Sequence, residues 1–199
     1  MTSTGLVDHL RLGDPAAWRE AYEAHAGRLL VWLRALAPAD VMSSAEDLAA
    51  ETWLTASTKI GEFRGSDDDF AGWLFGIGRL HALNARRRET RRATLPTDFA
   101  ADDHVPSEHH APAADEVAMR VAAVRQLIAP LSPRERDVIV CLEVAGLDIR
   151  TTAAALGLSQ ATVRVARHRG LARLRREPNI GRMAAAAVVA APTSTTGRP

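Results

Sequence analysis

The chain has 199 residues, 47% hydrophobic and 25% charged, with a formal net charge of only +1 at pH 7, and this length suits one large or two small water-soluble domains. Its single cysteine, Cys141, excludes an internal disulfide and a cysteine-rich zinc site. We expect a cytoplasmic protein without membrane insertion, because the start lacks a signal-peptide core and the apolar run at 183–191 is too short to span a bilayer.

Aromatic residues divide the chain in two. All nine lie between Trp18 and Phe99, whereas the rest of the chain is rich in Leu, Val, Ile and Ala. Two cores of different character predict two domains, joined by a proline-containing segment with six acids and no Lys or Arg that resembles a flexible linker. The expected division is an N-terminal tail at 1–13, a first domain at 14–95, an acidic linker at 96–116, a second domain at 117–177 and a C-terminal tail at 178–199.

The first domain shows three helical patterns. Apolar residues recur at three- and four-residue steps from Trp18 to Leu36, which predicts an amphipathic helix that Pro38 ends. A third helix is expected over 70–92, after a polar loop, and no stretch alternates long enough for a strand, so the predicted fold class is all-α. The second helix opens with the candidate N-caps Ser43 and Ser44, carries Glu46 and Asp47 in its first turn, and has Ala45, Leu48, Thr52 and Ala56 on its inner face.

The second domain has sharper signals. Ser132, Pro133 and Glu135 form an N-cap, a first-turn proline and a capping-box acid, and they start a helix that Gly146 stops. A short helix from Asp148 to about Leu156 and a glycine-containing turn follow. Ser159 then caps a last helix from Gln160 to about Arg176. Two helices joined by such a turn are typical of a helix-turn-helix motif.

The last helix concentrates positive charge, with five arginines, one histidine and no acid in residues 156–175. Val163, Gly170 and Leu174 form a stripe that we expect to be buried, and the other face is basic. In a major groove, the arginines can form hydrogen bonds with guanine, Gln160 can form them with adenine, and Val165 can contact the methyl group of thymine. The alternative is a solvated charged face without a ligand; the preceding turn favours DNA binding.

A second basic cluster ends the first domain, where residues 79–92 carry six arginines and one acid. Aromatic residues precede it, and aromatic rings beside arginines suit stacking on unpaired bases. For Trp73 and Phe75 we favour the alternative of a place in the core. Phe63 and Arg64, which lie in a loop next to a glycine, are the better candidates for base contacts.

Four segments together resemble a known family: AEDLAAETWLTA (45–56), FRG (63–65), FAGWLFGIGRLHALNARRR (70–88) and the helix-turn-helix region from Leu131 to Arg175. In this order they are similar to the two conserved domains of the extracytoplasmic-function (ECF) sigma factors of bacterial RNA polymerase, which belong to the sigma-70 family. The resemblance covers about residues 14–177. It implies a sigma region 2-like bundle and a sigma region 4-like domain, and a function in promoter recognition and transcription initiation.

The resemblance also implies site residues. The polymerase would be bound through Asp47, Leu48 and Glu51. The −10 promoter element would be contacted by Phe63, Arg64, Arg79, Asn84, Arg87 and Arg88. The −35 element would be read by Ser159, Gln160, Thr162, Arg164, Val165, Arg167, His168 and Arg169, with Arg167 extending from the edge of the buried stripe toward phosphate.

The implied partners are core RNA polymerase, promoter DNA and an anti-sigma factor, and no cofactor or metal is expected. An enzyme is disfavoured because His104, His109 and His110 lack the spacing of a metal or catalytic site, and no phosphate loop or nucleophile elbow occurs. The alternatives are a stand-alone helix-turn-helix regulator that binds operator DNA, and a polymerase-binding adaptor without promoter specificity.

Overall fold

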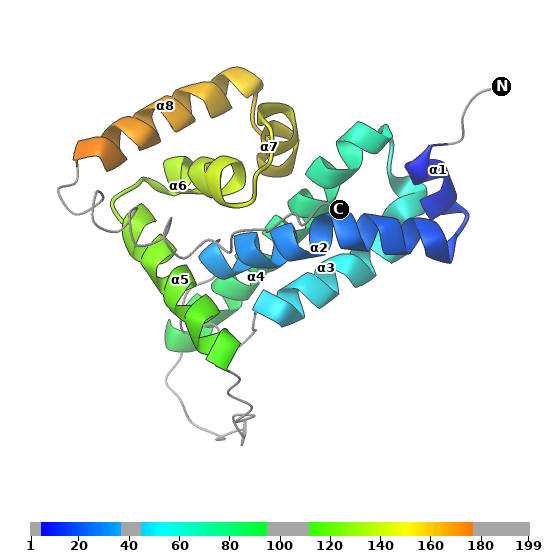
Figure 1. The fold of residues 1–199 in the computed structure, drawn as a ribbon, viewed down its shortest axis with the longest axis horizontal. Coiled ribbons are helices and arrows are strands. Elements are labelled where there is room, and N and C mark those ends of the chain that lie inside the picture. The colour runs from blue at the N-terminus through cyan, green and yellow to red at the C-terminus, as the bar shows by residue number, and fades with distance from the viewer. Residues whose placement is uncertain (1–4, 37–44, 95–111, 177–199) are drawn as a thin grey trace, which may run out of the picture.

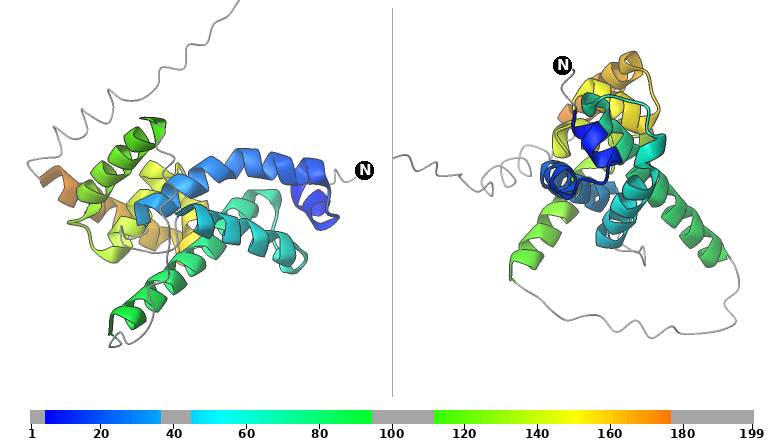
Figure 2. Two further views of the ribbon diagram at one scale, coloured as in Figure 1. Left: turned by 90° about the horizontal axis from the view of Figure 1, so that it is seen from below. Right: turned by 90° about the vertical axis from the view of Figure 1, so that its right-hand side faces the viewer.

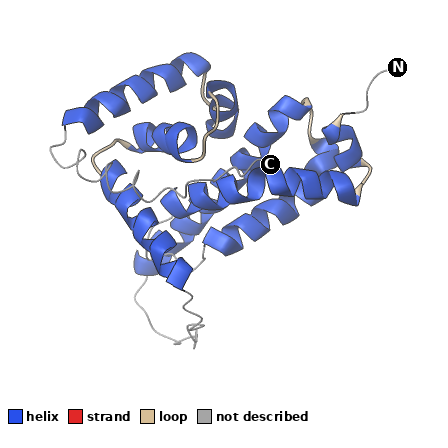
Figure 3. Ribbon diagram, in the orientation of Figure 1, coloured by secondary structure: helices blue, strands red, loops and turns tan. Residues whose placement is uncertain are grey.

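The protein is an assembly of helices. The computed structural model describes residues 5–36, 45–94 and 112–176, and within these ranges every regular element is helical and none is a strand (Figures 1 and 3), which confirms the all-α fold. The elements are α1 (Leu6–Arg11), α2 (Pro15–Leu36), α3 (Ala45–Lys59), the 3-10 turn η1 (Ile60–Glu62), α4 (Asp67–Thr94), α5 (Pro112–Ile128), α6 (Pro133–Ile139), the π-helical turn η2 (Val140–Val144), α7 (Ile149–Leu156) and α8 (Gln160–Arg176).

The helix periodicity places the predicted faces inward. The buried residues of α3 are Ala45, Leu48, Thr52 and Ala56, the four positions expected on its inner face. The Thr52 hydroxyl donates a hydrogen bond to the Leu48 carbonyl oxygen at 2.6 Å, so its burial leaves no unpaired donor. α3 packs against both α2 and α4, and these three long helices form the first half of the molecule.

The caps of the second half form as predicted. The Ser132 side chain and the Glu135 side chain make a reciprocal capping box at the start of α6. The Asp148 carboxylate accepts a hydrogen bond from the Thr151 backbone N–H at 2.7 Å and begins α7. Gly157 ends α7 with φ of 64°, a left-handed conformation that glycine adopts without steric cost. Because each boundary is fixed by a local hydrogen bond or a glycine, the turn between α7 and α8 is well defined.

The apolar core does not stop at the expected domain boundary. One cluster of buried residues contains Trp32 and Phe75 of the first half together with Val138 and Cys141 of the second. The Trp32 indole N–H donates a hydrogen bond to Cys141 Sγ at 3.2 Å, and its ring meets the Phe75 ring edge-on at a centroid distance of 5.3 Å. The structure therefore corrects the expectation of two separate cores: aliphatic residues of the second half pack onto aromatic residues of the first.

The two halves meet most closely where α7 crosses α4. A Cβ built on Gly72 of α4 would lie 2.8 Å from the Ala154 Cβ and 3.2 Å from the Thr151 carbonyl oxygen, so the absent side chain allows the close approach. On another side of the contact, Arg28 of α2 donates hydrogen bonds to the carbonyl oxygens of Ala145, at 2.9 Å, and Gly146, at 2.7 Å. Apolar and polar contacts thus hold the two halves together.

Two of the expected domain boundaries differ from those in the structure. Residues 6–11, placed in the N-terminal tail, form α1, because Val7 and Leu10 are buried in a second cluster that also contains Phe70. α5 begins at Pro112, inside the expected linker 96–116, and projects away from the C-terminal part of α4 (Figure 2). The remaining linker residues up to 111, the candidate caps Ser43 and Ser44, and the expected tail 178–199 lie outside the described residues.

Candidate nucleic-acid interface

The helix-turn-helix presents one face of α8 to solvent. Its opposite stripe, Val163, Ala166, Gly170 and Leu174, is buried as predicted. A Cβ on Gly170 would lie 3.0 Å from Ile139 Cγ1, which explains a glycine in the middle of this helix. Seven of the eight residues predicted to read DNA in this motif are exposed, and the eighth, Thr162, is half-buried. The exposed ones are Ser159, Gln160, Arg164, Val165, Arg167, His168 and Arg169.

Hydrogen bonds on this face set the starting positions of its side chains. The Ser159 hydroxyl accepts a hydrogen bond from the Thr162 N–H at 3.1 Å, the predicted N-cap. Arg164 donates to Gln160 Oε1 at 3.2 Å, one helical turn away. Arg167 donates to Glu143 Oε1 at 2.8 Å, and both side chains are exposed. Exposed pairs of this kind are weak, so DNA phosphate and base edges can compete for both arginines.

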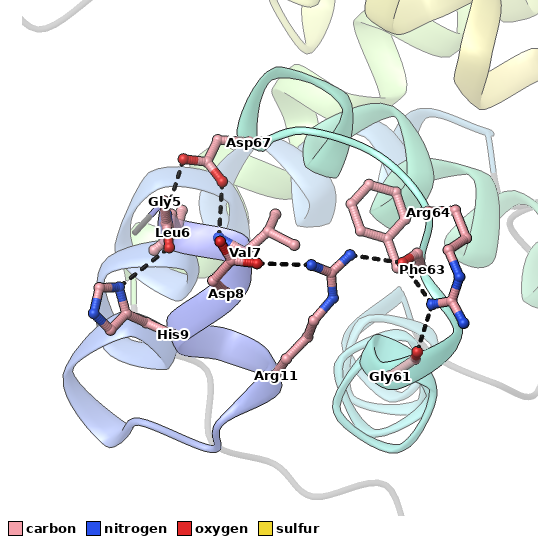
Figure 4. A network of polar contacts seen from close by, with 10 residues as sticks. All are labelled: Gly5, Leu6, Val7, Asp8, His9, Arg11, Gly61, Phe63, Arg64 and Asp67. Carbon is pink, nitrogen blue, oxygen red and sulfur yellow. Dashed lines mark hydrogen bonds and ion pairs between the residues drawn. The ribbon is translucent and has the colours of Figure 1, made fainter. Parts of the chain in front are cut away.

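The loop before α4 differs from the expectation at one residue. Arg64 is exposed, but Phe63 is buried, and its ring lies 4.9 Å from the Trp73 ring and 6.4 Å from the Phe70 ring. This corrects the expectation that Phe63 stacks on a base, because its ring already fills the core beneath the loop. Arg64 donates a hydrogen bond to the Gly61 carbonyl oxygen at 2.7 Å, which folds it back along the loop (Figure 4).

The basic part of α4 is partly engaged by the second half. Asn84, Arg87 and Arg88 are exposed. Arg79, by contrast, is half-buried, and its Nε lies 4.0 Å from Asp137 Oδ2 of α6. Burial raises the pKa of Asp137, which the nearby positive charge of Arg79 opposes. Arg79 therefore lies beside the second half and is only partly exposed to solvent in this arrangement.

Of the three residues of α3 that were predicted to bind polymerase, two are exposed and one is buried. Asp47 and Glu51 are exposed, and Glu51 Oε2 lies 3.3 Å from His81 Nδ1 of α4. Leu48 is only 2% exposed and belongs to the shared core. In this arrangement the Leu48 side chain lies in the core, so its predicted contact with the polymerase stays a prediction.

An ion-pair network links the loop of the first half to α7. Arg150 donates to Asp69 Oδ1 at 2.5 Å and lies 3.8 Å from Asp68 Oδ2. Asp69 also accepts hydrogen bonds from the Ser66 hydroxyl at 2.7 Å and from its backbone N–H at 3.0 Å. The Ser66 hydrogen bonds, followed by that from Arg150, lower the pKa of Asp69 to about 2. Asp69 is thus a carboxylate at neutral pH, and it fixes the end of the loop.

Sequence reasoning missed two groups of contacts around the predicted −10 site. α1 and its Arg11, which contacts the carbonyl oxygen of Phe63, were assigned to a tail. The contact of α7 with α4 was not expected either. Its signal in the sequence is the pair Gly72 and Gly76, two small residues one helical turn apart on α4, but such a pair does not identify its partner helix.

Two features of other protein classes are absent from the described part of the chain. None of its helices is both long enough and apolar enough to cross a membrane. Among the described residues, no group of three or more His, Cys, Asp or Glu side chains is arranged to hold a metal ion.

Comparison with known proteins identifies both halves. Residues 21–92 match the family Sigma-70 region 2, and residues 122–174 match Sigma-70, region 4. The ECF RNA polymerase sigma factor SigD of Mycobacterium tuberculosis is 33% identical over 172 residues, which cover 83% of this chain and 78% of SigD.

Two solved structures show the same fold. CnrH, in complex with the cytosolic domain of CnrY, has a TM-score of 0.60 and 24% identity over 85% of this chain and 92% of that one. The sigma factor RpoE of Bartonella quintana, in complex with the anti-sigma factor NepR, has a TM-score of 0.56 and 20% identity over 79% of this chain and 93% of that one. With the matched families and the SigD likeness, the helix-turn-helix and the basic helices identify the chain as a member of the ECF sigma factors of the sigma-70 family, which direct RNA polymerase to promoters.

Proposed function

We propose that α8 reads the −35 element of the promoters that this sigma factor selects. The observation that carries this proposal is its solvent face, where Gln160, Arg164, Val165 and His168 are all exposed while the opposite stripe is buried. Such a helix fits a major groove, where Arg164 is suited to bidentate bonds with guanine. Arg167 and Arg169 supply positive charge for phosphate, and the Ser159 cap and half-buried Thr162 fix the N-terminal end of the helix.

The −10 element is contacted by the first half. Arg64 is the exposed charged side chain of the loop, and Asn84, Arg87 and Arg88 belong to the exposed basic surface of α4. Phe63 supports the loop from below by its packing with Trp73. Asp47 and Glu51 contact the polymerase, since both are acidic residues that α3 presents to solvent, whereas its third exposed acid, Glu46, pairs with Arg34.

Promoter binding separates the two halves. The −35 and −10 elements lie about 25 base pairs apart, or about 85 Å at ~3.4 Å per base pair. A folded chain of 199 residues has a radius of gyration of about 16 Å when its halves are packed together. One closed molecule is therefore too small to reach both elements. Opening also releases Arg79 from Asp137 and makes it available to DNA.

The remaining parts of the proposal concern partners and location. The structure of RpoE with NepR motivates an anti-sigma factor as a further partner of this chain. The protein acts without catalysing a reaction of its own and works in the cytoplasm, where core polymerase and the chromosome are found. Unlike a stand-alone regulator, which the family comparison does not favour, it requires core polymerase for specific promoter contacts.

The test is start-site mapping in vitro with purified core polymerase on promoters randomised in both elements. We expect Arg164→Ala to lose preference at one or two −35 positions, by about tenfold for a lost bidentate contact, with −10 preference unchanged. Arg64→Ala should change −10 preference alone. Arg134→Ala, which removes an exposed arginine from α6, is the matched control. Unchanged preferences in both DNA-contact variants would contradict the assignment of these surfaces.

A further inference from the structure

The loop between η1 and α4 is attached to α1 at both of its ends. At its C-terminal end, the Asp67 carboxylate accepts hydrogen bonds from the backbone N–H groups of Leu6 and Val7, both at 2.8 Å. These N–H groups open α1, whose own N-cap, Gly5, provides no side-chain hydrogen bond. Asp67 therefore caps α1 from a distance of 60 residues along the chain.

The other end of the loop is held by Arg11. One guanidinium nitrogen donates to the Phe63 carbonyl oxygen at 2.8 Å, and another donates to Asp8 Oδ1 at 2.8 Å (Figure 4). The ion pair with Asp8 orients the guanidinium toward the loop. Between the two attachment points only Arg64, Gly65 and Ser66 remain, and Arg64 and Ser66 are exposed.

Apolar packing and steric fit support the same contact. Val7 and Leu10 of α1 are buried in the cluster that contains Phe63 and Phe70. A Cβ on Gly5 would lie 2.5 Å from Asp67 Oδ2, so a larger residue at this position must displace the carboxylate. An open cavity of about 290 Å³ lies between α1 and this region, lined by Val7, Asp8 and Arg11 on one side and by residues 65–68, at the end of the loop and the start of α4, on the other.

We propose that α1 is a positioning element for −10 recognition, which holds the loop 63–67 by Asp67 at one end and Arg11 at the other. This inference rests on the proposed contact of the loop with the −10 element. α1 precedes residues 21–92, which match the sigma region 2 family, so it lies outside the matched part of this chain. Arg11 and Asp67 fix the backbone from which Arg64 extends, and they determine selectivity without contacting DNA themselves.

Two variants perturb the two attachments separately. Gly5→Ala introduces a methyl group that displaces the Asp67 carboxylate, while the φ of −78° at Gly5 is compatible with alanine. Arg11→Gln removes the guanidinium that joins Asp8 to Phe63. Gly27→Ala, at an exposed position of α2 away from the loop, is the control for the first, because no atom lies within 4 Å of the added Cβ. Arg19→Gln, an exposed arginine on α2, is the control for the second.

The measurement is the ratio of initiation from a promoter with the preferred −10 element to initiation from one with a single base substitution in it. Binding to core polymerase and dependence on the −35 element are measured in the same samples. We expect Gly5→Ala and Arg11→Gln to lower the ratio by about threefold to tenfold, the range for a lost hydrogen bond to a charged group at a partly exposed site, with both other readouts unchanged. Arg11→Lys keeps the positive charge but has one donor nitrogen in place of the two that Arg11 uses, so its ratio should lie between those of Arg11→Gln and the wild-type protein.

Three other outcomes would overturn the inference or its basis. An unchanged ratio in Gly5→Ala and Arg11→Gln, with the wild-type protein still discriminating, would refute the role of α1 alone. A parallel loss of polymerase binding and −35 dependence would assign α1 a general role in stability. A wild-type protein without any −10 preference would instead refute the proposed function of the loop.

Discussion

The crossing of α4 and α7 gives a prediction that follows from single interatomic distances. Gly72→Ala places a methyl group 2.8 Å from the Ala154 Cβ and 3.2 Å from the Thr151 carbonyl oxygen. Neither atom belongs to the end of a flexible side chain, so the helices must move apart. Gly76→Ala, one turn further along α4, meets the Ala155 carbonyl oxygen at 3.7 Å and the Ala155 Cα at 3.9 Å, both ordinary contacts.

Both substitutions raise the helix propensity of α4, but only Gly72→Ala overpacks the crossing with α7. Replacing glycine by alanine inside a helix stabilises it by about 0.5–1 kcal/mol, because the unfolded chain loses conformational freedom. Overpacking a close contact costs about 1–3 kcal/mol. Gly76→Ala should therefore raise the free energy of unfolding by up to about 1 kcal/mol. The free energy of unfolding of Gly72→Ala should be about 1–3 kcal/mol lower than that of Gly76→Ala, because the added methyl group strains the helix crossing.

Urea denaturation of both variants measures this difference, and small-angle scattering reports whether the halves separate. The double variant Gly72→Ala/Ala154→Gly moves the methyl group from one helix to the other, so it should recover part of the strain but not the contact with Thr151. If Gly72→Ala is as stable and as compact as Gly76→Ala, the closed packing of α4 on α7 is refuted.

Further predictions concern the same contact surface and its caps. Burial raises the pKa of Cys141 to about 12, so this thiol should resist alkylation in the free protein. It should react faster when polymerase separates Cys141 from Trp32. Equal alkylation rates with and without polymerase would contradict the separation of the two halves. The pKa of Asp69 is lowered from 3.8 to about 2, so its contribution to stability is complete above pH 3.8 and is lost as the pH falls toward 2. Asp69→Asn has no carboxylate to protonate, so in an acid titration its free energy of unfolding should fall less steeply over this pH range than that of the wild-type protein. Asp148→Ala should lower the unfolding free energy by about 1 kcal/mol through the lost cap of α7, as measured by thermal denaturation.

Local features of the fold were predictable because each depends on neighbours in the chain. The capping box of Ser132 and Glu135, the stop at Gly157 and the inner face of α3 all formed as expected. These signals are hydrogen bonds over three residues or a repeat of 3.6 residues, and both can be read from a short window of sequence.

Contacts between distant segments were not predictable in this way. The pattern around Phe63 indicates an aromatic residue in a loop, but only the fold shows that α1 and Trp73 enclose it. Leu48 fits both the periodicity of the core and the family's binding pattern, and only the fold shows that its side chain is buried in this arrangement. α1 itself is six residues long, too short for periodicity to reveal, and its cap comes from Asp67 in a different helix.

Transcription in vitro with purified core polymerase on a library of genomic fragments, with and without this protein, tests the central claim most directly. The account predicts new, discrete start sites that are preceded by shared −35 and −10 elements and that appear only when both polymerase and the protein are present. The absence of new start sites, together with specific footprints made by the protein alone, would contradict it.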